Sequence, residues 1–288
     1  MGWIVISALS FGILPIFARM AYASGMDPIT LLAFRFLIAS VCMAPLLWQH
    51  RAEIPRGARL GILIALGAIG FVGEALAFFY ALQHAAAGIV ALLLFLYPAM
   101  VAIGSALLFK EQLGPSKIIA LVAALIGTAL TVGPSGSSRP LGIALGILAA
   151  LIYACFVLGS GYMSQFVGAT VSTAIIIMSA AACLCVLMLI RGPQLPTNLE
   201  GWGATLAMGT VSTVGAILTF FLGLERIGAT RAATIATLEP LITTVAAAVF
   251  LDEHLVLIQL LGGLFIVGGV LVLVRSASPA KDEALGPI

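Results

Sequence analysis

The sequence predicts an all-α polytopic membrane protein, made of ten transmembrane helices in two inverted repeats of five. Apolar residues make up 62% of the 288 residues and charged residues only 8%, and the mean hydropathy is +1.22. Soluble domains do not have this composition. Apolar stretches of about 20 residues, the length that crosses a bilayer, recur along the chain. A long segment also returns at a fixed offset.

The offset of that repeat is 142 residues, without a gap. The segment at 78–113 returns at 220–255, and Tyr97 is paired with Glu239, each followed by proline. Such self-similarity indicates two copies of one structural unit. We expect a first repeat over residues 1–135, a second repeat over 136–275 and a short cytoplasmic tail over 276–288.

Ten apolar stretches are long enough to be membrane spans, and short polar connections separate them. These connections are too short to fold outside the bilayer. We expect spans at roughly 3–23, 28–48, 59–83, 87–109, 115–133, 140–163, 170–190, 201–225, 230–251 and 256–274.

Ten spans place both termini on one side of the membrane, and basic residues indicate which side. Nine Lys and Arg residues fall on the side of the termini and three on the other, which predicts cytoplasmic termini. Because each repeat has an odd number of spans, the second enters the membrane from the opposite face. The nine are Arg51, Arg56, Arg59, Lys110, Lys117, Arg226, Arg231, Arg275 and Lys281, and the three are Arg19, Arg139 and Arg191.

Inverted halves can rock about a shared site, which favours a transporter. An intramembrane enzyme and a structural subunit are the alternatives from other classes. The segment at 209–215 has the wrong spacing for a nucleophile elbow, and we find neither metal-ligand spacing nor a phosphate-binding loop. We therefore expect no catalytic residue, metal or cofactor. A net charge of +2 argues against nucleic-acid binding.

Pro98 and Pro240 lie near the middle of spans 4 and 9. A proline inside a helix removes one hydrogen bond and frees the carbonyl four residues earlier, here that of Leu94 or Ala236. These carbonyls would then face a solute. The alternative is that each proline only kinks its helix for packing.

Glu239 is a carboxylate near the bilayer centre, where it costs at least about 2.5 kcal/mol unless it is paired, hydrated or protonated. It would either receive a substrate ammonium group or titrate and couple transport to protons. The structural alternative is a protonated Glu239 that hydrogen-bonds to a neighbouring helix.

Arg35 and Glu74 lie at similar depths in spans 2 and 3, which permits an ion pair. This pair would lock the two spans together. Arg35 would alternatively bind a substrate carboxylate, because guanidinium matches that planar anion with two parallel hydrogen bonds.

Further candidates are aromatic or lie at span ends. Tyr80 and His84 would form an exterior gate or simply mark the membrane interface. Phe11 and Tyr153, which are equivalent by the offset, would line a cavity or pack against helices and lipid. We predict substrate contacts for Phe11, Tyr80, His84, Tyr97, Pro98, Tyr153, Phe220, Glu239 and Pro240, and an ion pair or coupling for Arg35, Glu74 and Glu239.

The chain resembles the EamA-type exporters of the drug/metabolite transporter superfamily. The resemblance is carried by Tyr97-Pro98 through Leu113 with Gly127, and by Glu239-Pro240 through Leu255 with Gly269. Glu111 and Glu253 belong to this pattern, and we interpret them as helix-end or gate contacts.

The resemblance implies a multi-pass protein of the bacterial inner membrane that exports small metabolites by alternating access. Amino acids, and among them aromatic or hydrophobic ones, are the nearest model, and drugs or other metabolites are the alternative. The expected partners are a small-molecule substrate and the lipid bilayer. The chain would be a monomer or, through its glycine-rich spans 5 and 10, a homodimer.

Overall fold

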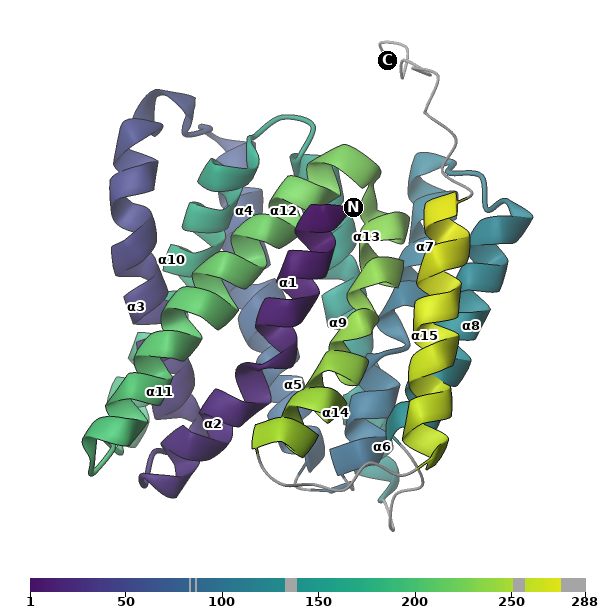
Figure 1. The fold of residues 1–288 in the computed structure, drawn as a ribbon. Helices are drawn as coiled ribbons and strands as arrows, with labels where there is room; N and C mark the ends of the chain where they lie inside the picture. Colours follow the sequence, from purple (N-terminus) through teal and green to yellow (C-terminus); the bar gives the residue numbers. More distant parts are fainter. Residues whose placement is uncertain (83, 86, 133–138, 251–256, 276–288) are drawn as a thin grey trace.

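The computed structural model describes residues 1–82, 84–85, 87–132, 139–250 and 257–275, and the secondary structure of these residues is helical, without strands (Figure 1). The helices are α1 (Gly2–Gly12), α2 (Leu14–Ala23), α3 (Pro28–Gln49), α4 (Ala58–Ala65), α5 (Val72–Leu82), α6 (Ala87–Leu94), α7 (Tyr97–Phe109), α8 (Pro115–Val132), α9 (Pro140–Met163), α10 (Ala169–Arg191), α11 (Leu199–Gly209), α12 (Ala216–Ile227), α13 (Ala229–Ala236), α14 (Leu238–Phe250) and α15 (Leu257–Arg275). Three short elements join them: the 3₁₀ turn η1 (Arg51–Glu53) and the π-helices η2 (Leu66–Phe71) and η3 (Thr210–Gly215).

Six helical segments of the described chain are long and apolar enough to cross a membrane. Three more apolar helices are shorter, and each of the nine segments overlaps a span predicted from the sequence and extends beyond it by at most two residues. The chain is thus a polytopic membrane protein. The six long segments are Gly2–Ala23, Pro28–Gln49, Ala58–Phe78, Pro140–Met163, Ala169–Arg191 and Leu199–Ile227, and the shorter ones are Tyr97–Phe109, Pro115–Leu130 and Leu260–Val272.

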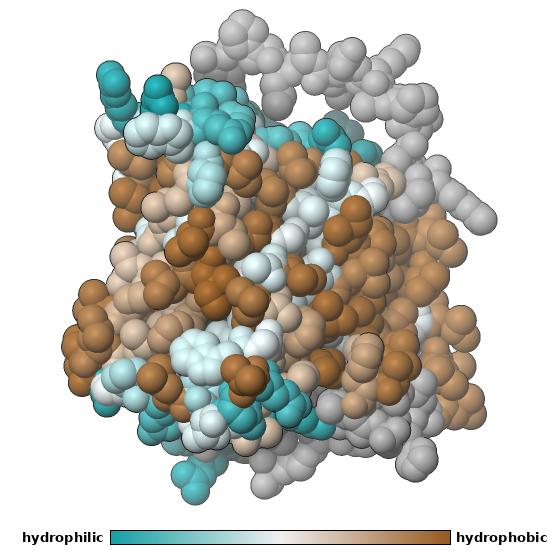
Figure 2. Space-filling model, turned by 60° about the vertical axis from the view of Figure 1, so that its left-hand side comes forward, coloured by the Kyte–Doolittle hydropathy of each residue, from teal (hydrophilic) through white to brown (hydrophobic). Residues whose placement is uncertain are grey.

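The surface has the layering that a bilayer requires. Apolar side chains occupy the middle of the face in Figure 2, and hydrophilic side chains gather at its upper and lower edges. Large apolar residues that would be buried in a soluble protein are exposed, among them Leu107, Ile190 and Leu264. Such a surface would aggregate in water, whereas lipid covers it without penalty.

Polar caps fix the start of helices where the chain re-enters the apolar layer. The Asp27 carboxylate accepts hydrogen bonds from the backbone amides of Ile29 and Thr30 at 3.0 and 3.1 Å, ahead of α3. The Asn198 side chain accepts one from the Gly201 amide at 2.8 Å, ahead of α11. These bonds satisfy helix N–H groups that would otherwise lack a partner.

The two halves of the chain pack against each other in a reciprocal manner. α1 lies along α12, with Ile4 against Gly223, and α9 lies along α5, with Gly142 against Ala85. The first helix of each half, α1 or α9, thus begins beside the end of α12 or beside the residues that follow α5 in the other half. α1 and α9 begin at opposite ends of the bundle, whereas the start of α1 and the end of α15 lie at the same end (Figure 1).

α8 and α15 form the most extensive helix pair of the fold, and two glycines set their spacing. A Cβ on Gly127 would lie 2.6 Å from the carbonyl oxygen of Gly262, and a Cβ on Gly269 would lie 2.7 Å from that of Ala120. Gly127 and Gly269 are equivalent by the 142-residue offset. Small residues are what allow helix backbones to approach this closely in lipid.

We predict that Gly127→Ala lowers the melting temperature of the purified protein, because the methyl group overpacks a backbone contact at a cost of about 1–3 kcal/mol. Gly268→Ala, on α15, is the matched control. Its new methyl would meet no atom within 4 Å, so the better helix propensity of alanine leaves stability equal or slightly higher. Equal melting temperatures for both variants would contradict the close contact.

Candidate functional site

Spans 4 and 9 are each broken into two helices at the residues that the repeat pairs. α6 gives way to α7 at Tyr97, and α13 gives way to α14 just before Glu239. Pro98 and Pro240 lie in the first turn of the new helices, where a missing N–H is tolerated. The prolines therefore mark helix starts rather than kinks within a continuous helix, and they place Tyr97 and Glu239 near the middle of the bundle.

Spans 3 and 8 carry a second matched irregularity. Each contains one turn of π-helix, η2 in span 3 and η3 in span 8. A π-helical turn shifts the direction of the side chains that follow it and is frequent at functional sites. Glu74 follows η2 within one turn, and η3 contains Ser212 and Thr213.

Arg35 of α3 is a buried cation, with only 5% of its surface exposed. Its Nε donates a hydrogen bond to Oγ1 of Thr213 at 2.6 Å, and its Nη2 donates one to the carbonyl oxygen of Ser212 at 3.2 Å. Its guanidinium carbon lies 5.1 Å from the centre of the Phe36 ring. Span 8 therefore holds the guanidinium in one place within the bundle.

The carboxyl groups of Glu74 and Glu239 lie close enough to Arg35, and to each other, for their charges to interact. Both side chains are half-buried. Neither forms a salt bridge or hydrogen bond with another described residue, so the predicted Arg35–Glu74 ion pair is not a direct contact here. One cation and two uncommitted carboxyl groups share the interior of the bundle.

Tyr97 and Tyr153 connect this charged group to an aromatic cluster. Their ring centres are 4.6 Å apart in an edge-to-face arrangement, and both phenols lie within electrostatic range of Glu239. Tyr153 stacks on Phe156 at 5.8 Å, and Phe156 contacts Phe71 at 5.6 Å. Phe71 contacts Phe36, the ring beneath Arg35, at 5.0 Å. A row of aromatic contacts thus runs from Tyr97 to Arg35.

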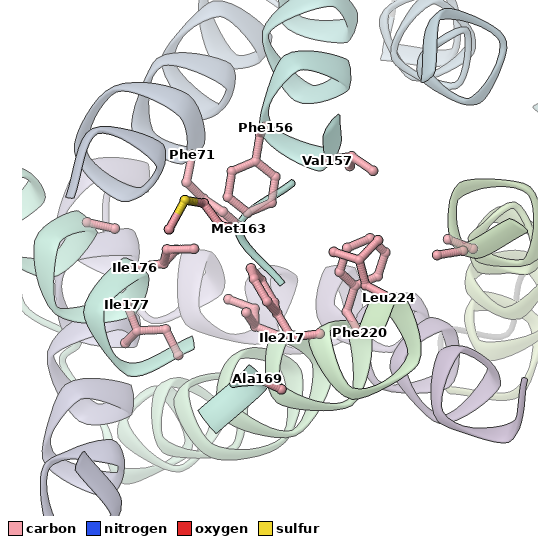
Figure 3. Packing of buried hydrophobic residues seen from close by; sticks show 14 of the residues in the cluster. Phe71, Phe156, Val157, Met163, Ala169, Ile176, Ile177, Ile217, Phe220 and Leu224 are labelled. Carbon is pink, nitrogen blue, oxygen red and sulfur yellow. The ribbon is translucent and has the colours of Figure 1, made fainter. Parts of the chain in front are cut away.

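A narrow, mostly apolar pocket adjoins this row. Figure 3 shows Phe71, Phe156, Ile217 and Phe220 gathered from η2, α9 and α12. Even with all of its empty space counted, about 200 Å³, the pocket is smaller than the roughly 300–1,000 Å³ of typical ligand sites. A ligand of typical size would enter this pocket only if helices moved apart. The lining residues are Phe11, Phe71, Tyr153, Phe156, Ile217, Phe220 and Phe221.

Tyr80 and His84 lie away from this centre, at the end of the bundle where span 3 finishes. The Tyr80 hydroxyl accepts a hydrogen bond from Arg191 at 3.2 Å. The backbone carbonyl of His84 accepts one from the Arg139 amide at 2.9 Å. The gate predicted for Tyr80 and His84 stays a prediction, and a direct substrate contact would require the substrate to pass them.

Glu111 lies at the other end of the bundle and joins its two halves. One carboxylate oxygen is 2.8 Å from the Lys117 ammonium, and the other accepts a hydrogen bond from the Thr230 hydroxyl at 2.6 Å. Lys110, in a left-handed conformation with φ 53°, turns the chain after α7 immediately before Glu111. The equivalent Glu253 lies outside the described residues.

Sequence reasoning missed several residues of this centre. Thr213 is the repeat equivalent of Phe71 and Ser212 that of Gly70, so the pairing of repeats indicated an apolar environment rather than a partner for Arg35. The hydroxyl-rich turn at 210–213 was the available signal. Phe156 lies one helical turn after Tyr153, and this spacing on one face of a helix would have identified it.

With this geometry in view, comparison with known proteins is informative. The EamA-like transporter family model matches residues 1–133 and again residues 140–275. The chain belongs to the EamA-like transporter family. The two matches fall on the two halves that the internal repeat predicts.

Relatives of this EamA-like transporter cover nearly its whole length. It is 27% identical over 284 residues to the uncharacterized transporter YcbK of Bacillus subtilis, covering 92% of this chain and 90% of the relative. An uncharacterized transporter of Archaeoglobus fulgidus is 26% identical over 270 residues, covering 93% and 94%. A protein of known crystal structure shares the fold, with a TM-score of 0.83 at 20% identity and coverage of 96% and 98%. The chain is a transporter rather than an enzyme.

We predict that Thr213→Val destabilises the protein by about 1–3 kcal/mol, because it leaves a buried guanidinium N–H without its acceptor. Thr234→Val is the control, since the equally buried Thr234 hydroxyl bonds only to the Thr230 carbonyl of its own helix. Thermal unfolding of the purified variants measures the difference. Equal losses in the two variants would show that Thr213 does not hold Arg35.

Proposed function

We propose that this EamA-like transporter is a secondary exporter of small metabolites, most readily amino acids with apolar or aromatic side chains. It works by alternating access across the bacterial inner membrane. The observation that carries the proposal is the meeting of Arg35, Glu74 and Glu239 inside the membrane bundle, beside an aromatic pocket and two broken helices. Charged groups at this depth are rare and mark substrate or ion pathways.

The proposed architecture is ten spans in two inverted repeats, residues 1–135 and 136–275, with cytoplasmic termini. Two separate family matches support the division. The opposite starting ends of α1 and α9 and the distribution of Lys and Arg support the inversion and the orientation. Paired broken helices between inverted repeats are where secondary transporters bind substrate.

The contacts of Glu111 support a state closed toward the cytoplasm. Lys117 belongs to the first repeat and Thr230 to the second, so the Glu111 carboxylate ties the repeats together at that end. The repeat equivalents of Lys117 and Thr230 are Gln259 and Gly88. Breaking the contact of Glu111 with Thr230 would accompany opening toward the cytoplasm.

Glu239 and Glu74 are placed to receive the ammonium group of an amino acid. The aromatic pocket suits an apolar or aromatic side chain, because its lining carries few polar atoms. This lining also favours a second candidate function, the export of apolar drugs. Both functions use the same binding centre and differ only in the class of substrate that binds there.

We predict that liposomes containing the purified protein transport radiolabelled amino acids with apolar side chains, and that Glu239→Gln lowers the flux about 10- to 100-fold. Hydrogen bonds to charged groups contribute about 1.5–3 kcal/mol, and each 1.4 kcal/mol is a factor of ten. Glu200→Gln, at an exposed glutamate of α11, controls for the loss of any carboxylate.

The same vesicles, assayed with and without a pH gradient, test the coupling. If Glu239 exchanges protons for substrate, the gradient accelerates transport by the parent but not by Glu239→Gln. A parent insensitive to the gradient limits Glu239 to binding substrate. Normal transport by Glu239→Gln at every pH removes both roles, and absence of flux for every amino acid contradicts the amino-acid proposal.

A further inference from the structure

We infer that the central site recognises its substrate as an organic cation, through the ammonium group, and that a substrate carboxylate contributes little to binding. This inference deepens the proposed function and rests on the same site. The protein would hold the substrate by its ammonium end. The favoured class is primary amines with an apolar or aromatic body, of which amino acids are one example.

The charges of the site favour a cation. Arg35 contributes one positive charge, and Glu74 and Glu239 contribute one negative charge each when ionised, so the three groups together carry −1 only when both carboxyls are ionised. The other titratable groups within electrostatic range of the three are the phenols of Tyr22, Tyr97 and Tyr153, which are uncharged in their protonated form. An ammonium group stabilises the ionised carboxyls and brings that state to neutrality, whereas a carboxylate would raise its negative charge.

Arg35 is already engaged by the protein. Two of its N–H groups are directed at Thr213 and Ser212, and its guanidinium lies over Phe36. With only 5% of its surface exposed, it offers little access to a second anion. Glu74 and Glu239, when ionised, would also repel a substrate carboxylate that approaches Arg35.

The acceptor groups, in contrast, are uncommitted. The half-buried carboxyls of Glu74 and Glu239 have no hydrogen-bond or salt-bridge partner among the described residues. Tyr97 is only 3% exposed, yet its hydroxyl makes no hydrogen bond to any residue that the structure describes, and it lies within electrostatic range of Glu239. The Tyr97 hydroxyl is therefore available to a ligand. An ammonium group offers three donors to these oxygens.

The aromatic walls add a second attraction for the same group. Tyr153, Phe156 and Phe71 form consecutive ring contacts beside the carboxyls, and Phe11 and Phe220 complete the pocket. Aromatic faces are electron-rich and attract cations, with a gain that increases when water is excluded. Apart from the Tyr153 hydroxyl, the side chains of this lining offer no hydrogen-bond donor to a carboxylate. Carboxyl groups and rings therefore select the same end of the substrate.

Equilibrium binding to the full chain in lipid nanodiscs tests this inference with three radiolabelled ligands that share one side chain. They are L-phenylalanine amide, which is a cation, L-phenylalanine, a zwitterion, and N-acetyl-L-phenylalanine, an anion. We expect the dissociation constant of the amide to be at least about tenfold lower than that of phenylalanine. We expect the anion not to bind.

The same assay on Glu74→Gln and Glu239→Gln should show at least about tenfold weaker binding of the amide, with Glu200→Gln unchanged. Phenylalanine that binds more tightly than its amide, or measurable binding of N-acetyl-phenylalanine, would assign recognition to a carboxylate and overturn the inference. If a variant fails to fold, the order of the three ligands for the parent protein still decides.

The outcomes also separate this inference from the proposed function. Vesicles that transport phenylalanine while the amide neither binds nor competes refute cation recognition and leave amino-acid export standing. Absence of flux for every amino acid, together with absence of binding for all three ligands, refutes both.

Discussion

The burial of the Arg35 guanidinium is the constraint on which the rest of this centre depends. A charge inside a membrane protein costs several kcal/mol unless other groups hold it. Here η3 supplies a hydroxyl and a carbonyl as acceptors, and the carboxyls of Glu74 and Glu239 supply opposite charge without direct contact. This arrangement fixes the cation and leaves the anions free. The protein thus holds the buried cation without a direct contact from either carboxyl.

Helix irregularities are what bring these groups together. Within a regular helix the backbone N–H and C=O groups bond to each other. In lipid, a group that an irregularity leaves unpaired needs another hydrogen-bond partner. The π-helical turns of spans 3 and 8 each have a buried side, at Phe71 and Thr213, and Tyr97 at the break of span 4 is buried as well. The hydroxyl of Thr243 on α14, for example, donates to the carbonyl of Gly12 at 2.9 Å, where α1 gives way to α2. Irregular backbone and charged side chains thus occupy the same protected region.

Much of the fold follows from the sequence because its signals are long and redundant. Apolar stretches of membrane length locate the helices, and the 142-residue offset pairs Tyr97 with Glu239 and Gly127 with Gly269, positions that the structure makes equivalent in role. The caps at Asp27 and Asn198 use residue types typical of helix starts. The breaks at spans 4 and 9 are where the sequence carries proline, although the sequence suggested kinks.

The contacts of the centre were harder to predict. Similar depth placed Arg35 near Glu74, but depth does not determine which way a helix face turns, and Arg35 is instead bonded to Thr213, 178 residues away. Repeat pairing could not find that partner, since the first half has Phe71 at the equivalent position. Side-chain direction depends on the π-helical turns, and these have no clear sequence signature. Tyr97 and Tyr153 were predicted to lie well inside their spans, and their mutual contact required the structure.

Alternating access, as proposed, requires that one enclosed centre be reached from the two sides of the membrane in turn. Accessibility of a single cysteine at Tyr153, introduced by Tyr153→Cys after replacement of Cys42, Cys155, Cys183 and Cys185, measures this directly. Membrane-impermeant thiol reagents applied to oriented vesicles should label the cysteine from either side, and a substrate that binds the centre should slow both reactions. Labelling from one side only, or from neither, would contradict alternating access to this centre.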